Sequence, residues 1–282
     1  MMDNRFDTIQ LLNKKRARII LSVLLIEYLL FILSGVSYSF LYGASMKIVN
    51  VDFTYWFVNL IQFPELVSHY YFIGVGLDLL TVLLLITSIW DPGKTWVLRI
   101  LFILLLFFYI TFNTYHTHPN IQLGYALILF PFCFKRADLF DIAWDFLRYY
   151  LLFFYFFAGI YKFIGGGIQE VNLMTWFLES QNALYFYLHP STWRQETIRW
   201  LILHPYISWS LYLLAAVVES VTIVGFFTKR LDKIIFILLV LFHLANWFLM
   251  DIAPFGMITF LLLLVLNPVK IVHQSHPDVK TC

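Results

Sequence analysis

Charged residues are scarce in this sequence. Asp, Glu, Lys and Arg make up 13% of the 282 residues, whereas hydrophobic residues make up 61% and the mean hydropathy is +0.79. A soluble domain cannot keep so much apolar surface in water, so the composition excludes that class and indicates a polytopic membrane protein. The formal net charge is +2, which excludes a general basic surface for nucleic acid.

Cysteine is also scarce, and several catalytic motifs are missing. Cys133 and Cys282 lie far apart, and both fall in segments predicted to face the cytoplasm, so we expect no disulfide. No phosphate-binding loop, dinucleotide fingerprint, nucleophile elbow or His-Glu-x-x-His motif occurs. Residues 1–18 are polar and the apolar run after them is too long for a signal peptide, so we expect no cleavable leader.

The chain is instead rich in long apolar runs. A run of about 17 to 25 residues is long enough to cross a bilayer as a helix. We therefore predict an all-α polytopic membrane protein of about eight transmembrane helices, with one or two further helices at the outer interface. The predicted spans are residues 19–42, 72–90, 96–113, 121–134, 142–164, 207–227, 234–250 and 255–266.

Basic residues follow the alternation of these spans. Of the 19 Lys and Arg residues, only Lys47, Arg194 and Arg199 fall in predicted outer segments, and Arg148 and Lys162 fall inside a span. The others fall in segments predicted to be cytoplasmic, as the positive-inside rule requires. We predict a bacterial inner-membrane protein with both termini in the cytoplasm. Its parts are a cytoplasmic segment 1–18, a transmembrane domain 19–266 with an outer cap 165–206, and a cytoplasmic tail 267–282.

Lys162 follows an aromatic, apolar run and precedes three glycines, Gly165–Gly167. Two interpretations of this amine are open. It can snorkel to the headgroups as a membrane anchor, or it can lie in a protein pocket and act as a base. The glycines favour the pocket, because they end the helix without side chains and let the following loop fold back over the amine.

The outer segments carry side chains that would surround this amine. His116 and His118 lie in the short loop before the fourth span, at the predicted level of Lys162, where acid–base or hydrogen-bond duty is expected. A metal ion is disfavoured there, since no Cys or carboxylate is near in sequence. The aromatic cap supplies predicted substrate contacts, namely Trp176, Tyr185 and Arg194.

Five further ionisable residues lie inside predicted spans, where such groups are paired or functional. Glu27 and Arg148 lie at similar depths from the cytoplasmic side, which predicts an ion pair. Glu219 and His243 are predicted to meet near the middle of the membrane, either as a packing hydrogen bond or as a proton relay. Asp78 has no evident partner in the sequence.

Four of these segments, in this order, resemble the membrane domain shared by vitamin K-dependent gamma-carboxylases and bacterial HTTM (horizontally transferred transmembrane) proteins. The resemblance covers most of the chain, from about Lys14 to Pro268. The segments are the outer-loop histidines 116 and 118 with Gly124; the aromatic-Ala-Gly-x-x-Lys element 155–162; Glu219 followed by the basic turn Lys229-Arg230; and Phe242-His243-Leu244 followed by Ile252-Ala253-Pro254-Phe255.

The resemblance implies a function for Lys162 and its neighbours. In the carboxylases the lysine at this position is the proposed base that deprotonates reduced vitamin K, supported by the histidine at the position of His118. Here Thr117 precedes that histidine and Pro119 follows it, unlike the carboxylase pattern, and the large lumenal domain that holds the carboxylase substrate is absent. Glutamate carboxylation in a dedicated substrate is therefore not expected.

The size is similar to that of a bacterial subfamily like sporulation-delaying protein B, whose members help mature a secreted peptide toxin. By this resemblance the chain would modify or mature a secreted peptide or a lipid-soluble substrate in an outward-facing Lys/His pocket, with a quinone as the implied cofactor. The bilayer, a secreted peptide and a membrane partner protein would be its partners. The alternative is a non-catalytic membrane chaperone, an assembly factor or a small transporter.

Overall fold

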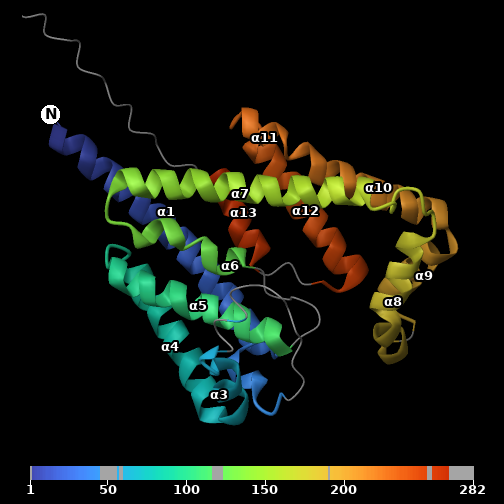
Figure 1. Ribbon diagram of the computed structural model, residues 1–282, viewed down its shortest axis with the longest axis horizontal. Coiled ribbons are helices and arrows are strands. Elements are labelled where there is room, and N and C mark those ends of the chain that lie inside the picture. The colour runs from blue at the N-terminus through green and yellow to red at the C-terminus, as the bar shows by residue number, and fades with distance from the viewer. Residues whose placement is uncertain are drawn as a thin grey trace, which may run out of the picture.

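The computed structural model describes residues 2–44, 56, 60–115, 123–189, 191–252 and 256–266, with the side chains of residues 2–12 left out. Every regular element in these residues is helical, which confirms the all-α prediction (Figure 1). The helices are α1 Met2–Leu33, η1 Tyr38–Leu41, α3 Phe63–His69, α4 Tyr71–Trp90, α5 Thr95–Tyr115, α6 Gly124–Leu127, η2 Phe130–Cys133, α7 Ala137–Ile164, α8 Leu173–Leu188, α9 Trp193–Leu203, α10 Pro205–Val221, α11 Val224–Phe227, α12 Asp232–Met250 and α13 Met257–Val265.

Six helical segments of the described residues are long and apolar enough to cross a membrane. They begin and end close to the first, second, third, fifth, sixth and seventh predicted spans, and they are the segments of a multi-pass membrane protein. The segments are Asn13–Leu41, Tyr71–Trp90, Thr95–Tyr115, Ala137–Ile164, Pro205–Phe227 and Asp232–Met250.

The fourth and eighth predicted spans do not form long helices in the described residues, so the count of full-length spans is six rather than eight. The fourth is broken into α6 and η2, where Pro131 has no N–H to continue the hydrogen-bond ladder. The eighth is α13, with nine residues. Helix α5 runs from Thr95 to Tyr115, and Arg99 near its start donates to the Cys133 carbonyl at 3.0 Å. The end of η2 therefore lies beside the start of α5.

Helix boundaries follow local sequence signals. Pro205 opens α10, where its missing N–H would have had no intrahelical partner. Helix α7 ends at Ile164, two residues after Lys162, and Gly165 is its C-cap residue, as the glycine run predicts. Helix α1 continues without a break through the predicted cytoplasmic segment and into the first span.

The core lies between α1, α5, α6, α7 and α13, and most of its large side chains are aromatic. Edge-to-face contacts link Tyr28 to Phe108 and Phe31 to Tyr125, with ring centroids 5.4 and 5.3 Å apart. Phe260 of α13 packs directly on Gly124 of α6. The two short helices therefore fill the centre of the bundle, while the long helices keep one face toward lipid.

Helices α8 and α9 form a hairpin beyond the end of α7, in the region predicted as the outer cap (Figure 1). Four buried residues hold the hairpin together, namely Met174, Leu178, Ile198 and Leu201. Partly buried side chains of α10 and α12 pack against this small cluster. The hairpin is therefore attached to the ends of two membrane helices.

Candidate functional site

The candidate site forms where α7 crosses α10. Gly159 makes the close approach possible, because an added Cβ would lie 2.7 Å from the Ser220 nitrogen and 2.9 Å from the Ala216 carbonyl oxygen. Both of those atoms belong to the α10 backbone, which cannot move aside as a side chain can. Gly159 therefore sets the distance between the two helices that carry Lys162 and Glu219.

Lys162 donates a short hydrogen bond to Glu219 across this crossing, and the two form an ion pair. The side chain of Lys162 is 24% exposed, whereas that of Glu219 is 5% exposed. Gly159 lies level with Ser220, so Glu219 is about half a helical turn deeper than the backbone of Lys162. The lysine side chain therefore runs back along α7 toward the membrane interior, which is opposite to the direction of a snorkelling anchor.

A second polar pair lies deeper on the same face of α7. The hydroxyl of Tyr155, which is buried, forms a short hydrogen bond with Nε2 of His243 on α12. Tyr155 is also close enough to Glu219 to interact with its carboxylate electrostatically. Lys162, Glu219, Tyr155 and His243 thus form one group, called the polar cluster below, which joins α7, α10 and α12.

The polar cluster corrects one predicted pair. Glu219 and His243 were expected to bond to each other, but Glu219 accepts from Lys162 and His243 bonds to Tyr155. The two residues do lie on neighbouring helices, as the depth argument required. Tyr155 of α7 bonds to His243 instead, a contact that no spacing within α10 or α12 reveals.

The predicted ion pair between Glu27 and Arg148 is wrong. Arg148 donates from Nε and Nη2 to the Asp232 carboxylate at 2.8 and 2.6 Å, and from Nη2 to the Gly225 carbonyl at 2.7 Å. Both partners of this ion pair are buried. Asp232 is the first residue of α12, so one carboxylate both lies at the positive end of that helix dipole and neutralises a buried guanidinium.

Glu27 instead contacts the start of α13. Its carboxylate accepts a short hydrogen bond from the Thr259 hydroxyl and further hydrogen bonds from the backbone of Gly256 and Thr259. These groups form the first turn of α13, whose N–H donors have no intrahelical partner. Glu27 therefore caps a half-length helix that begins inside the bundle, and the positive end of the helix dipole stabilises its negative charge.

Asp78 has four partners, although the sequence indicated none. Its oxygens accept from the Tyr28 hydroxyl at 2.7 Å, from Ser37 Oγ at 2.8 Å, and from the backbone nitrogens of Tyr38 and Ser39 at 3.0 Å each. These donors belong to the end of α1 and the start of η1. Asp78 on α4 therefore fixes the turn between α1 and η1 and has a structural role.

Two of the three predicted substrate contacts of the cap, Tyr185 and Arg194, contact each other. Trp176 is exposed on α8. Arg194 stacks on the Tyr185 ring, 4.2 Å from its centroid, and donates to the Phe248 carbonyl at 2.7 Å and to Asp251 at 3.2 Å. Arg194 thus binds the cap to the end of α12, and Tyr185 orients it.

His116 and His118 lie outside the described residues, so their placement beside Lys162 stays a prediction. Among the residues that the structure does describe, no group of three His, Cys, Asp or Glu side chains is arranged to hold a metal ion. Tyr155 and Asp232 were missed by sequence reasoning. Tyr155 was treated as one of many apolar aromatic residues in its run, and Asp232 lies in a turn in which Lys and Arg predominate.

No family model, curated protein or solved structure matches this chain. The function is therefore argued from the polar cluster and its surroundings.

Proposed function

We propose that this is a membrane protein of the gamma-carboxylase-like HTTM class that modifies or matures a secreted peptide or a lipid-soluble substrate. The observation that carries the proposal is the Lys162–Glu219 pair. Its amine is turned into the bundle, remains partly exposed, and lies beside the Tyr155–His243 pair. Ionisable groups are rare inside membranes and mark functional sites unless they serve packing alone.

The pair supports proton abstraction in the following way. Transfer of one proton from the ammonium of Lys162 to Glu219 gives a neutral amine and a neutral carboxylic acid, without leaving a charge in low dielectric. The neutral amine then accepts a proton from an acidic C–H, N–H or O–H bond of the substrate and leaves an anion on it. The ammonium formed in this step stabilises that anion. A reduced quinone, as implied by the family resemblance, is one substrate with such a proton.

We propose eight membrane passages, six by long helices and two by the short elements α6–η2 and α13. The position of the end of η2 beside the start of α5 supports the first short passage, and the capped start of α13 inside the bundle supports the second. With eight passages both termini lie in the cytoplasm and the α8–α9 cap faces outward, as the basic residues indicate. Lys162 then lies near the outer surface.

A non-catalytic role is the alternative, and the same ion pair is compatible with it. A chaperone, assembly factor or small transporter needs Lys162 and Glu219 only to hold α7 against α10. That role requires a positive charge and a hydrogen-bond donor, not an amine that loses its proton. Arginine supplies the first two and cannot supply the third below about pH 12.

Lys162→Arg separates the two functions. A host strain without the protein is complemented with the wild type or the variant, and its secreted peptides and membrane lipids are compared by mass spectrometry. We expect a mass change that depends on the wild type and is lost with Lys162→Arg, while expression and melting temperature stay unchanged. The matched control is Lys229→Arg, which alters a lysine paired with Asp145 at the other end of α7. A product that persists with Lys162→Arg would establish the non-catalytic role.

A further inference from the structure

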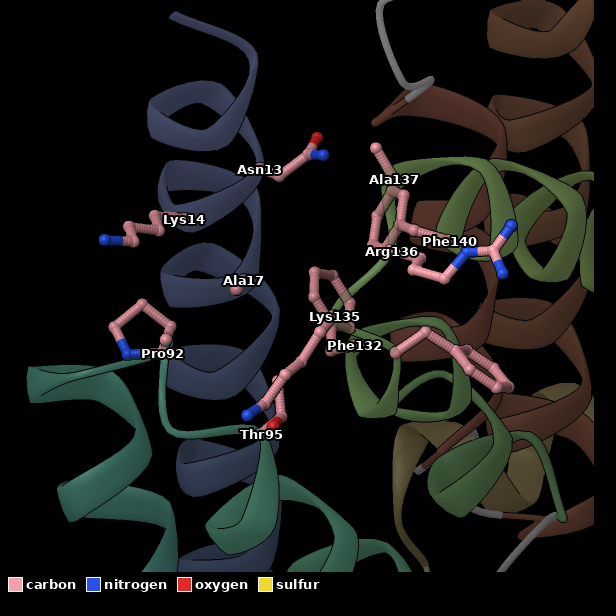
Figure 2. A pocket seen from close by; sticks show the side chains of 12 residues that line it. Asn13, Lys14, Ala17, Pro92, Thr95, Phe132, Lys135, Arg136, Ala137 and Phe140 are labelled. Carbon is pink, nitrogen blue, oxygen red and sulfur yellow. The ribbon is translucent and has the colours of Figure 1, made fainter. Parts of the chain in front are cut away.

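A cavity of about 300 Å³ (Figure 2) lies near the start of α7, at the opposite end of the molecule from the α8–α9 cap (Figure 1). It opens between residues 13–17 of α1, the α4–α5 turn, the end of η2 and the start of α7. Its lining residues are Asn13, Lys14, Ala17, Pro92, Gly93, Thr95, Phe132, Phe134, Lys135, Arg136, Ala137 and Phe140. Its volume is at the lower end of the range for small-molecule sites, which suits a headgroup rather than a whole lipid.

The cavity lies at the level where membrane spans begin. Two lining residues, Thr95 and Ala137, are the first residues of the apolar segments that α5 and α7 contribute. A group bound here would therefore lie in the layer of lipid headgroups. The basic residues of the loops at this end assign it to the cytoplasmic leaflet, which carries the anionic lipids.

The basic side chains at this end divide into two sets. The first set is already used by the fold: Arg18 donates to the Ile89 carbonyl, Arg99 to the Cys133 carbonyl and Arg136 to the Asp138 carboxylate. Figure 2 shows the Arg136 guanidinium directed away from Lys135. These three arginines stabilise helix ends, so their charges are not free for a ligand.

Lys14 and Lys135 form the second set. Within the described part of the chain neither has a hydrogen-bond or ion-pair partner, and they come from different walls of the cavity. The Lys14 ammonium lies against the α4–α5 turn, where a Cβ on Gly93 would be 3.8 Å from its Nζ and 3.2 Å from Oδ1 of Asp91, a carboxylate that pairs with Lys94. Two unpaired ammonium groups at one cavity attract a group with at least one negative charge.

The inner surface of the cavity is apolar. Ala17, Phe132 and Phe140 are buried there, and Phe134 is partly buried. A free phosphate ion would gain nothing from these side chains, whereas the glycerol and first methylene groups of a lipid would pack on them. The Thr95 hydroxyl and the Asn13 amide add hydrogen-bonding groups at the rim.

We propose that this cavity binds the headgroup of an anionic phospholipid of the cytoplasmic leaflet. Lys14 and Lys135 attract the phosphate to this cavity, and the glycerol lies on the phenylalanine surface. Bound there, the lipid contacts both α1, at residues 13–17, and the start of α7. The site is at the other end of the molecule from the polar cluster, so this proposal is independent of any catalytic role of Lys162.

The test uses the purified full chain in detergent, with bound lipid counted by native mass spectrometry during titration. The probes are dioleoylphosphatidylglycerol, dioleoylphosphatidylcholine and soluble glycerol phosphate. We expect phosphatidylglycerol to bind in preference to phosphatidylcholine. The double variant Lys14→Gln/Lys135→Gln should weaken this binding about 25-fold, from about fivefold per lysine near a membrane surface. Its matched control is Lys15→Gln/Lys233→Gln, which removes two exposed lysines that do not line the cavity and should change little.

Three results would overturn the proposal. Equal binding of the two phospholipids would remove the role of charge. An equal loss in both double variants would assign the preference to net charge and not to the cavity. Displacement of the lipid by glycerol phosphate at an equal concentration would show a site for a soluble phosphate ester. Ala17→Leu provides a second variant, because it fills the apolar surface without changing charge and should also weaken lipid binding.

Discussion

At the scale of single residues, the buried charged side chains differ in how many of their hydrogen-bonding atoms have a partner. Asp78 has four donors, whereas Arg148 keeps one nitrogen, Nη1, without a partner. Trp144, one turn earlier on α7, also has a buried Nε1 without a partner among the described residues. The stretch of α7 near Arg148 is therefore the least tolerant of a further loss of hydrogen bonds.

Removing one member of the Arg148–Asp232 pair should destabilise the protein strongly. Asp232→Asn leaves a buried guanidinium without its counter-charge, and the expected loss in the free energy of unfolding is about 3 to 5 kcal/mol. The measurement is reversible unfolding in mixed micelles. Arg136→Gln is the control, since it breaks an exposed ion pair at the start of the same helix and should change nothing measurable. If the two variants lost similar free energies of unfolding, burial of the ion pair would not explain its contribution to stability.

The pairing of these charges could be predicted from the sequence only in part. Spacing along a span predicts the depth of a residue in the membrane, and Glu219 and His243 do lie on neighbouring helices, although each bonds to a different residue of α7. Depth is one coordinate of three, however, and it carries no information about which helix a side chain faces. Glu27 and Arg148 share a depth, but Glu27 faces α13 and Arg148 faces α12. Lys162 was identified as the central amine, whereas its bond to Glu219 required the packing of α7 on α10.

At the scale of elements, the contact between α7 and α10 depends on a residue without a side chain. Gly159→Ala should force the two helices apart, because the new Cβ would meet backbone atoms of Ala216 and Ser220 closer than 3.0 Å. Overpacking of this kind costs about 1 to 3 kcal/mol and should also lengthen the Lys162–Glu219 hydrogen bond. Unfolding in micelles measures the loss of stability. The longer Lys162–Glu219 hydrogen bond should appear as a loss of the activity found for the wild type.

Gly76→Ala is the matched control for this helix contact. Gly76 lies within α4, is exposed, and has nothing within 4 Å of an added Cβ. Alanine there should stabilise the helix by up to about 1 kcal/mol, because glycine is the weaker helix former. If both alanine variants changed stability in the same direction, close helix packing at Gly159 would not be the reason for its presence.

The elements themselves were the most predictable feature. Hydrophobic length decides whether a helix can cross lipid, so the six long segments could be read from the apolar runs. The same criterion fails for α6, η2 and α13, because protein surrounds them and satisfies their free backbone groups. Their apolar residues were recognised, but their true lengths depended on Pro131 and on the carboxylate of Glu27.

At the scale of the whole molecule, the orientation in the membrane can be tested with one accessible cysteine. The variant carries Cys133→Ala and Cys282→Ser and a new cysteine, Ser191→Cys, between α8 and α9, where the residue is exposed. A membrane-impermeant thiol reagent should label it in intact cells, because the proposed orientation turns the cap outward. Labelling that appears only after lysis would reverse the orientation and would place the Lys14–Lys135 cavity in the outer leaflet.

The buried position of α13 has a consequence for how the protein is made. Five residues of this late segment belong to the core that α1, α5, α6 and α7 share, namely Met257, Phe260, Leu261, Leu263 and Leu264. The ribosome adds these residues only after every long helix has been synthesised. Until then the earlier helices surround an unfilled centre, and Glu27 has no helix end to cap. The bundle therefore cannot close progressively from its N-terminus during translation, and its final compaction must follow the synthesis of α12.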